Sequence, residues 1–340
     1  MRSRLEAAAK QIVPAVVEDW AKGSCEEMSD VLGGSSTWPS ISVIVPTRDR
    51  PELLRHAVQS ILGQDYPGEV ECVVVFDQSA PTPITVEPAE RRRLRLIRNE
   101  RTPGLAGARN AGVLASDGEL VAFCDDDDDW LPGKLRLQVD AMRPNPEAVV
   151  ATCGIFVLYR TRTIRRLPPN GTTVTQEQLL RKRMMEVHPS TVLVRRTALF
   201  GSIGLVDEAI PGSYAEDYEW LLRAARVAPI VVVREPLVRI HWHPSSFFEE
   251  RWQIIVRALT YLLDKHPEFE QEPAGLARIE GQLAFAYAAL GQSKIARRWA
   301  IQALRRNWRE RRGYVALAVS TRVLRPETVI RMAHTLGRGI

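Results

Sequence analysis

The sequence has 340 residues and a mass of 38.2 kDa, which is enough for one large domain or two ordinary ones. Apolar residues make up 45% of the chain and charged residues 26%, so collagen-like, low-complexity and globally disordered proteins are excluded. Basic residues exceed acidic ones by 46 to 41, a formal net charge of +5. A surplus this small does not indicate a nucleic-acid partner, because the placement of the charges matters more than their sum.

The N-terminus and the cysteines predict a cytoplasmic protein. Glu6 and Lys10 interrupt the first apolar stretch, so no signal-peptide core is expected, and residues 1–40 are predicted to be a helical leader and linker. The four cysteines stand far apart without a Cys-x-x-Cys pair, which favours neither a zinc site nor a disulfide framework. No run of apolar residues is long enough to predict a membrane-spanning helix.

From residue 41 on, short apolar runs alternate with amphipathic segments. The runs predict buried strands at residues 41–47, 71–76, 94–97 and 119–124. Helical patterns lie between them, and this alternation predicts βαβ crossovers and a parallel sheet with helices on both faces. Mixed strands and helices continue to about residue 245, whereas the pattern from Arg251 on is helical throughout. The expected fold class is therefore α/β with a C-terminal all-helical extension.

Polar residues follow three of these strands, at the edge where open parallel sheets bind ligands. They are residues 47–49, residues 77–79 and five consecutive aspartates, 125–129. The aspartates stand between a buried strand and Trp130, which leads into an amphipathic helix; a solvated acidic loop is the alternative. Carboxylates held together repel one another, and a divalent cation relieves that repulsion. Oxygen ligands favour Mg²⁺ or Mn²⁺ over zinc.

Four segments, in this order, resemble the family 2 glycosyltransferases of the GT-A fold. They are ISVIVPTRDR (41–50), ECVVVFDQS (71–79), GLAGARNAGVLASDGELVAFCDDDDDWLPGKL (104–135) and GLVDEAIPGSYAEDYEWLLRAA (204–225). The resemblance implies a GT-A domain over residues 41–245, with a Rossmann-like, mostly parallel sheet. Residues 1–40 and the helical region 246–340 lie outside it.

The resemblance implies a metal site on the aspartate run. Asp125 and Asp127 match the DXD motif, whose last aspartate coordinates the metal that bridges the donor diphosphate. Asp127 is thus the first candidate ligand for Mg²⁺ or Mn²⁺, Asp125 contacts ribose or metal, and Asp126 and Asp128 shape the turn. His243 resembles a histidine that lies near the metal or diphosphate in several members, with His241 as the alternative.

The resemblance also implies a donor pocket and a catalytic base. Asp77 matches the acid that reads the uracil ring, and Pro46 and Thr47 offer backbone contacts to the base. Arg109 matches a residue at the donor pocket that is suited to neutralise phosphate. Asp217 stands in the position of the base that takes the acceptor proton; an acidic first-turn residue stabilised by the helix dipole is the alternative.

The implied activity is a metal-dependent, inverting transfer of one sugar from a nucleotide-diphosphate sugar to an acceptor hydroxyl. A UDP-sugar is the expected donor, and cell-surface glycan, glycolipid or secondary-metabolite synthesis is the expected setting. The QxxRW motif of processive synthases is absent, whereas Phe76 and Gln78 depart from the family's V-D-D-G-S segment at the nucleobase pocket. A nucleotidyltransferase and a catalytically degenerate sugar-nucleotide-binding scaffold remain the alternatives.

The net charge is divided unevenly along the chain. Residues 291–340 contain 12 basic and 2 acidic residues, a net charge of +10, which leaves −5 for residues 1–290. Trp299, Trp308 and Tyr314 lie among these arginines. A basic tail with aromatic residues predicts peripheral contact with the anionic inner face of a membrane, and lipid-linked acceptors there. A solvated or self-associating helical face is the alternative.

Overall fold

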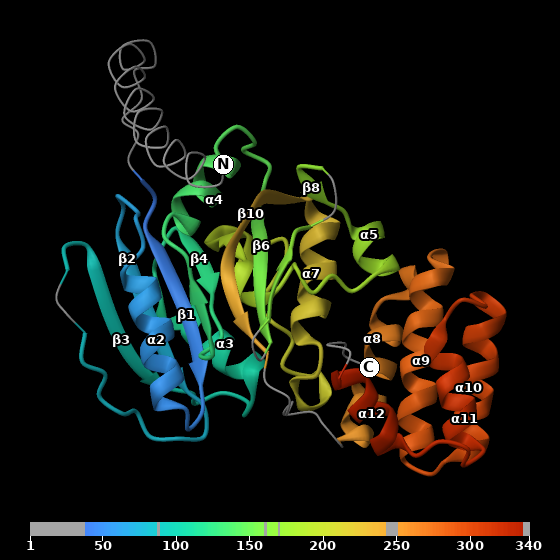
Figure 1. Ribbon diagram of the computed structural model, residues 1–340. Coiled ribbons are helices and arrows are strands. Elements are labelled where there is room, and N and C mark those ends of the chain that lie inside the picture. The colour runs from blue at the N-terminus through green and yellow to red at the C-terminus, as the bar shows by residue number, and fades with distance from the viewer. Residues whose placement is uncertain (1–37, 87–88, 160–161, 169–170, 243–250, 336–340) are drawn as a thin grey trace, which may run out of the picture. The chain divides into compact units, whose positions relative to one another are not determined.

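The computed structural model describes residues 38–86, 89–159, 162–168, 171–242 and 251–335, and the residues from Pro39 on form one compact unit (Figure 1). Residues 1–37 of the predicted leader and linker (1–40) lie outside the described residues. Within the described ranges, no helix combines the length and apolar character needed to cross a bilayer.

A central sheet organises this unit. Ten strands are found in the described part of the chain, in the order β3-β2-β1-β4-β9-β6-β10-β5, with β7 beside β6 and β8 beside β10. The strands are β1 (Ile41–Thr47), β2 (Val70–Phe76), β3 (Arg92–Arg98), β4 (Leu120–Phe123), β5 (Asp128–Trp130), β6 (Val150–Tyr159), β7 (Arg162–Arg166), β8 (Thr173–Val174), β9 (Leu193–Arg195) and β10 (Ile230–His241).

The first half of the sheet is parallel. β2 pairs in parallel with both β1 and β3, and β1 pairs in parallel with β4. Every residue of β1 and β2 is buried, which explains why both strands are mostly apolar and show no regular polar alternation. Beyond β4 the sheet is mixed, because β9 runs antiparallel to both β4 and β6. The predicted α/β fold class is confirmed.

Helices cover the sheet and continue past it. In α2, Leu54, Val58 and Ile61 recur at helical spacing and are buried, Pro51 opens the helix, and Gly63 follows its end. The α-helices are α2 (Pro51–Leu62), α3 (Leu105–Ala115), α4 (Lys134–Met142), α5 (Gln176–Arg181), α6 (Arg196–Leu199), α7 (Glu216–Val227), α8 (Trp252–Lys265), α9 (Pro273–Ala289), α10 (Ser293–Arg306), α11 (Arg311–Ser320) and α12 (Pro326–Thr335). Short 3₁₀ helices are η1 (Pro189–Thr191), η2 (Pro211–Ser213) and η3 (Pro267–Gln271).

The C-terminal helices share a core with the α/β part. Leu276, Ile279 and Leu283 of α9 belong to the same buried apolar cluster as Tyr218 and Leu221 of α7. α8 contacts η2. α9 contacts α5, and the ribbons of these two helices are neighbours in Figure 1. The helical extension is therefore joined to the α/β part by packing as well as by sequence.

Candidate active site

The polar residues that follow β1, β2 and β4 meet around one cavity of about 500 Å³. Six residues predicted from the sequence line it: Pro46, Thr47, Asp77, Asp125, Asp126 and Asp127. Arg109 and Asp217 instead line a small hollow of about 20 Å³ beside Phe123 and Trp220. His243 lies outside the described residues.

The rim of this cavity contains unusual backbone conformations. Asp49, Gln78 and Ser213 have φ angles of 54°, 55° and 54°, in the left-handed region that favours glycine. Gly104 has a φ of 115°, and a Cβ at this position would lie 2.8 Å from the Ser213 Oγ. Such conformations cost free energy and persist only where surrounding packing enforces them, commonly at ligand sites. Packing around the rim therefore enforces these conformations.

Asp77 is fixed at the end of β2 by three donors. Asn99 Nδ2 donates to Asp77 Oδ1 at 2.8 Å, while Gln78 Nε2 and the Gly104 amide donate to Oδ2 at 2.9 and 3.1 Å. An ionised carboxylate offers about four acceptor positions, so one remains for a donor in the cavity. Gln78, which replaces the family's glycine, thus reaches the carboxylate that is expected to read the base.

The buried side chain of Arg109 links Asp125 to Glu216. Its Nη2 donates to Asp125 Oδ1 at 2.7 Å, and its Nη1 donates to Glu216 Oε1. Burial acts to lower the pKa of Arg109, but the charges of Asp125, Glu216 and Asp217 raise it above its usual value. Burial raises the pKa of Glu216, against the opposing charge of Arg109. Arg109 is therefore a permanent cation that holds two carboxylates of the site in place.

Arg50, in the turn between β1 and α2, bridges two aspartates of the run. Its Nη1 lies 3.3 Å from Asp126 Oδ1 and 2.9 Å from Asp127 Oδ2. Thr47 Oγ1 also donates to Asp126 Oδ2 at 2.6 Å. Burial raises the pKa of Asp126 to about 6 despite these contacts. The Arg50 guanidinium thus relieves part of the repulsion between these aspartates. The sequence pattern predicts a metal ion in that role.

The aspartate run is not a loop throughout. Asp128 and Asp129 belong to β5, which pairs antiparallel with β10, so their side chains point to opposite faces. Asp129 accepts from Arg239 Nη1 and is hydrogen-bonded to His241 Nε2, both at 2.8 Å. His241, the alternative to His243, therefore pairs with the last aspartate of the run. Asp128 is turned the other way and accepts from Ser190 Oγ at 2.5 Å.

Asp125, Asp128 and His188 form a group that fits a divalent cation. In the described part of the chain, one ligand atom from each lies within 4.8 Å of the other two. His188 Nε2 is 3.9 Å from Asp125 Oδ2, and its Nδ1 is 3.5 Å from Asp128 Oδ2. Carboxylates suit Mg²⁺ and Mn²⁺, and the imidazole favours Mn²⁺ of the two. Asp127 is not in this group, and its Oδ2 pairs with Arg50 instead.

Asp217 lies in the first turn of α7 and has a close cationic partner. Arg183 Nη2 lies 3.1 Å from each of its carboxylate oxygens. Burial acts to raise the pKa of Asp217, but the charges of Arg183 and Arg109 lower it below its usual value. The carboxylate is consequently ionised at neutral pH, as a general base requires.

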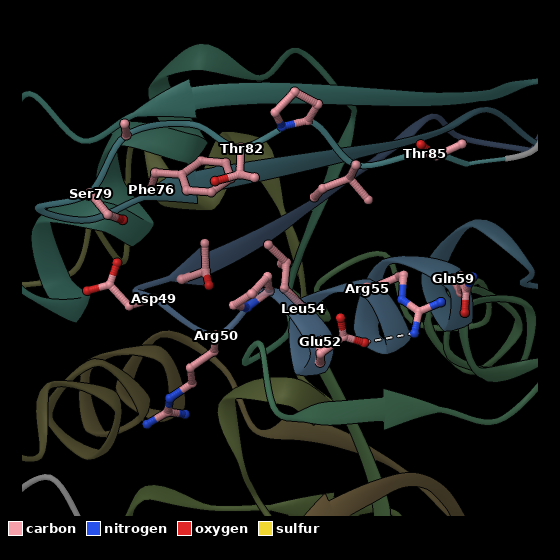
Figure 2. Close-up of a pocket in the computed structure, with 15 residues that line it drawn as sticks. Asp49, Arg50, Glu52, Leu54, Arg55, Gln59, Phe76, Ser79, Thr82 and Thr85 are labelled. Carbon is pink, nitrogen blue, oxygen red and sulfur yellow. Dashed lines mark hydrogen bonds and ion pairs between the residues drawn. The ribbon is translucent and has the colours of Figure 1, made fainter.

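Another hollow, of about 740 Å³, shares Thr47, Asp49 and Arg50 with the 500 Å³ cavity. Figure 2 shows Phe76 and Thr82 on one side of it and Leu54 of α2 on the other. Phe76 stands where the family has an acid, and it gives this hollow part of its apolar wall. The replacement of the family's acid by Phe76 therefore affects this hollow, whereas Asp77 lines the other cavity.

Comparisons with known proteins identify relatives over much of the chain. The Glycosyl transferase family 2 profile matches residues 42–200. The uncharacterized glycosyltransferase RP339 of Rickettsia prowazekii is 24% identical over 240 residues, which are 65% of this chain and 73% of that protein. The Escherichia coli UDP-Glc:alpha-D-GlcNAc-diphosphoundecaprenol beta-1,3-glucosyltransferase WfgD is 32% identical over 105 residues, 31% of this chain and 42% of that protein.

Solved structures share the fold at low identity. Residues 1–349 of S. aureus TarS in complex with UDP-GlcNAc align with a TM-score of 0.55 and 17% identity, covering 88% of this chain and 92% of that one. The mannosyltransferase PcManGT from Pyrobaculum calidifontis, in complex with GDP-Man and Mn²⁺, aligns with a TM-score of 0.51 and 18% identity, covering 94% and 85%. Together with the profile match and the carboxylates gathered at the sheet edge, these likenesses identify residues 42–200 as a Glycosyl transferase family 2 region on the GT-A fold.

Proposed function

We propose that the protein transfers a single sugar from a UDP-sugar to an acceptor hydroxyl and inverts the configuration at the anomeric carbon. The observation that carries this proposal is the single cavity lined by Asp77, Asp125 and Asp127 at the ends of parallel strands. The UDP-GlcNAc bound to TarS and the UDP-glucose in the name of WfgD support a uridine donor. The nucleobase then binds beside Asp77 and the backbone of Pro46 and Thr47.

The leaving diphosphate needs positive charge near the aspartate run. Arg50 already lies between Asp126 and Asp127, and it can follow the diphosphate as the donor binds. Asp125, Asp128 and His188 are the residues that can hold Mg²⁺ or Mn²⁺, with Asp127 joining them once Arg50 has moved. A cation held by these residues would supply positive charge for the leaving diphosphate. The Mn²⁺ in the PcManGT complex supports this proposal.

Asp217 is the proposed general base. Its carboxylate is held ionised by Arg183 and Arg109, and it accepts the proton of the acceptor hydroxyl during attack. The attack comes from the face opposite the diphosphate, so one displacement inverts the sugar. Glu216, the other half of the acidic pair, instead accepts from Arg109 and positions Asp125 through that arginine.

We also propose that the basic tail holds the enzyme at the anionic inner face of a membrane, where lipid-linked acceptors lie. Ile301, Trp308 and Tyr314 are 44%, 68% and 51% exposed among the tail's arginines. The Arg309 guanidinium lies 5.0 Å from the Trp308 ring centroid. The undecaprenol-linked acceptor in the name of WfgD supports this placement. Full-length protein should sediment with phosphatidylglycerol vesicles and not with phosphatidylcholine vesicles; equal sedimentation with both refutes the contact.

The donor is tested by incubating the protein with UDP-, dTDP- and GDP-sugars and Mn²⁺, without acceptor. Slow hydrolysis of a UDP-sugar to UDP and free sugar is expected, because water replaces the acceptor. The same donor should raise the melting temperature by mass action. Release of UMP and sugar 1-phosphate instead indicates attack at phosphorus, as in a nucleotidyltransferase, and binding of a donor without any reaction indicates a degenerate sugar-nucleotide-binding scaffold.

A further inference from the structure

Three arginines from distant parts of the chain gather behind the proposed base. Arg183 follows α5, Arg278 lies on α9 and Arg312 on α11. The guanidinium carbons of Arg183 and Arg278 lie 5.8 and 5.3 Å from the ring centroid of Tyr218. Tyr218 is the residue after Asp217 on α7, so the C-terminal helices bring positive charge to the immediate neighbourhood of the base.

The positive charge of this cluster is only partly balanced. Arg183 pairs with Asp217, and Arg312 Nη1 lies 3.1 Å from Glu310 Oε1. Arg278 donates to the Tyr218 hydroxyl at 2.8 Å and contacts Gln282 Oε1 at 3.5 Å, and neither partner carries a negative charge. Within the described ranges, the buried Nε atoms of Arg278 and Arg312 have no hydrogen-bond partner.

Like charges therefore face one another across a partly buried region. Burial together with the charges of Arg312 and Arg183 lowers the pKa of Arg278. Desolvated cations with unused donors are unfavourable unless an anion joins them. Guanidinium groups match the oxygens of phosphate in geometry, with two parallel donors each. The side chains of Arg183 and Arg312 are 40% and 33% exposed, so a solute can reach the cluster.

We propose that Arg183, Arg278 and Arg312 form a phosphate-binding subsite for the acceptor. The inference rests on the proposed function, since it places the acceptor hydroxyl at Asp217 and a phosphate ester or diphosphate of the same molecule at the arginines. Arg183 belongs to the arginine cluster and also pairs with Asp217. An incoming phosphate therefore draws its guanidinium away from the Asp217 carboxylate, which must accept the proton. The C-terminal helices thereby help to select an anionic acceptor.

Binding of methyl phosphate to the full chain tests the subsite. Saturating UDP and Mn²⁺ fill the donor site first, and calorimetry then measures the affinity for methyl phosphate. The wild type should bind it, and Arg278→Gln should weaken binding about tenfold or more, because one charge-assisted contact is lost. Arg278→Lys should recover part of the affinity for methyl phosphate, because it keeps the positive charge. No such recovery is expected if Arg278 only links α9 to α7. Arg297→Gln, an exposed arginine on α10 outside the cluster, is the matched control and should bind as the wild type does.

The same measurements separate failure of the subsite from failure of the proposed function. Equal affinity of wild type and Arg278→Gln, or no binding by the wild type, overturns the subsite. If Arg278→Gln melts well below the wild type, Arg183→Gln replaces it, because that side chain is more exposed. Hydrolysis of a UDP-sugar by the wild type is measured in parallel. Hydrolysis without phosphate binding refutes the subsite alone, whereas arginine-dependent phosphate binding without hydrolysis of any donor refutes the proposed function alone.

Discussion

Glu219 joins the helix that carries Asp217 to the C-terminal helices, and it provides a quantitative test of that junction. Its side chain is fully buried. Arg223 Nη2 donates to Oε2 at 2.8 Å, and Lys265 Nζ and His266 Nε2 lie 3.0 and 3.1 Å from Oε1. Burial acts to raise the pKa of Glu219, but the bonds from His266, Arg223 and Lys265 lower it to about 2.

The lowered pKa makes part of the stability depend on pH. The carboxyl has an ordinary pKa of 4.5 and a folded pKa of about 2, so its ionised form stabilises the fold by about 3 kcal/mol at neutral pH. Because the folded pKa is the lower one, this contribution is complete above pH 4.5 and is lost as the pH falls toward 2. At about pH 3, roughly 2 kcal/mol has been lost.

Urea unfolding of the wild type and Glu219→Gln at pH 6 and pH 3 measures this loss. The wild type should be the more stable protein at pH 6, and its advantage should shrink by about 2 kcal/mol at pH 3. Glu270→Gln, a change at an exposed glutamate of η3, is the control and should show little difference at either pH. If the difference in unfolding free energy between wild type and Glu219→Gln is the same at both pH values, the lowered pKa of Glu219 is refuted.

Three further changes test the site itself. Asp217→Asn should lower the initial rate of transfer by about a hundredfold or more, while calorimetry still detects UDP binding; an unchanged rate removes Asp217 from the mechanism. Gly104→Ala should lower the stability by about 1–3 kcal/mol, seen as a lower melting temperature, because φ is 115° and Ser213 Oγ lies 2.8 Å from the new Cβ. Wild-type stability in that variant contradicts the strain argument. EDTA should abolish transfer, and Mn²⁺ or Mg²⁺ should restore it; activity indifferent to chelation is incompatible with the metal proposal.

The parallel half of the fold and its binding edge could be predicted from the sequence. Strands expected at 41–47, 71–76, 94–97 and 119–124 are found within two residues of those bounds. Buried strands are continuous apolar runs, and this pattern is local in the chain. Residues that follow such strands must meet at one edge, which is why six expected residues line a single cavity.

The remaining features depend on contacts between distant residues. The aspartate run offers no periodic signal that Asp128 and Asp129 belong to a strand, because β5 forms only by pairing with β10 more than a hundred residues later. His188 precedes a 3₁₀ helix and carries no motif of its own, yet the fold brings it to Asp125 and Asp128. Arg278 and Arg312 lie outside the family resemblance altogether, so only tertiary structure connects them with Asp217.

The shared core between α7 and α9 limits how this enzyme can be re-engineered. Leu276, Ile279 and Leu283 pack into the same cluster as Tyr218 and Leu221, so a seam cut between the sheet and the C-terminal helices exposes apolar surface on both pieces. Chimeras between relatives that exchange only the C-terminal helices should therefore aggregate or fail to express. A viable exchange has to carry α7 together with α8–α11 as one block, with its joint in the loop before Glu216.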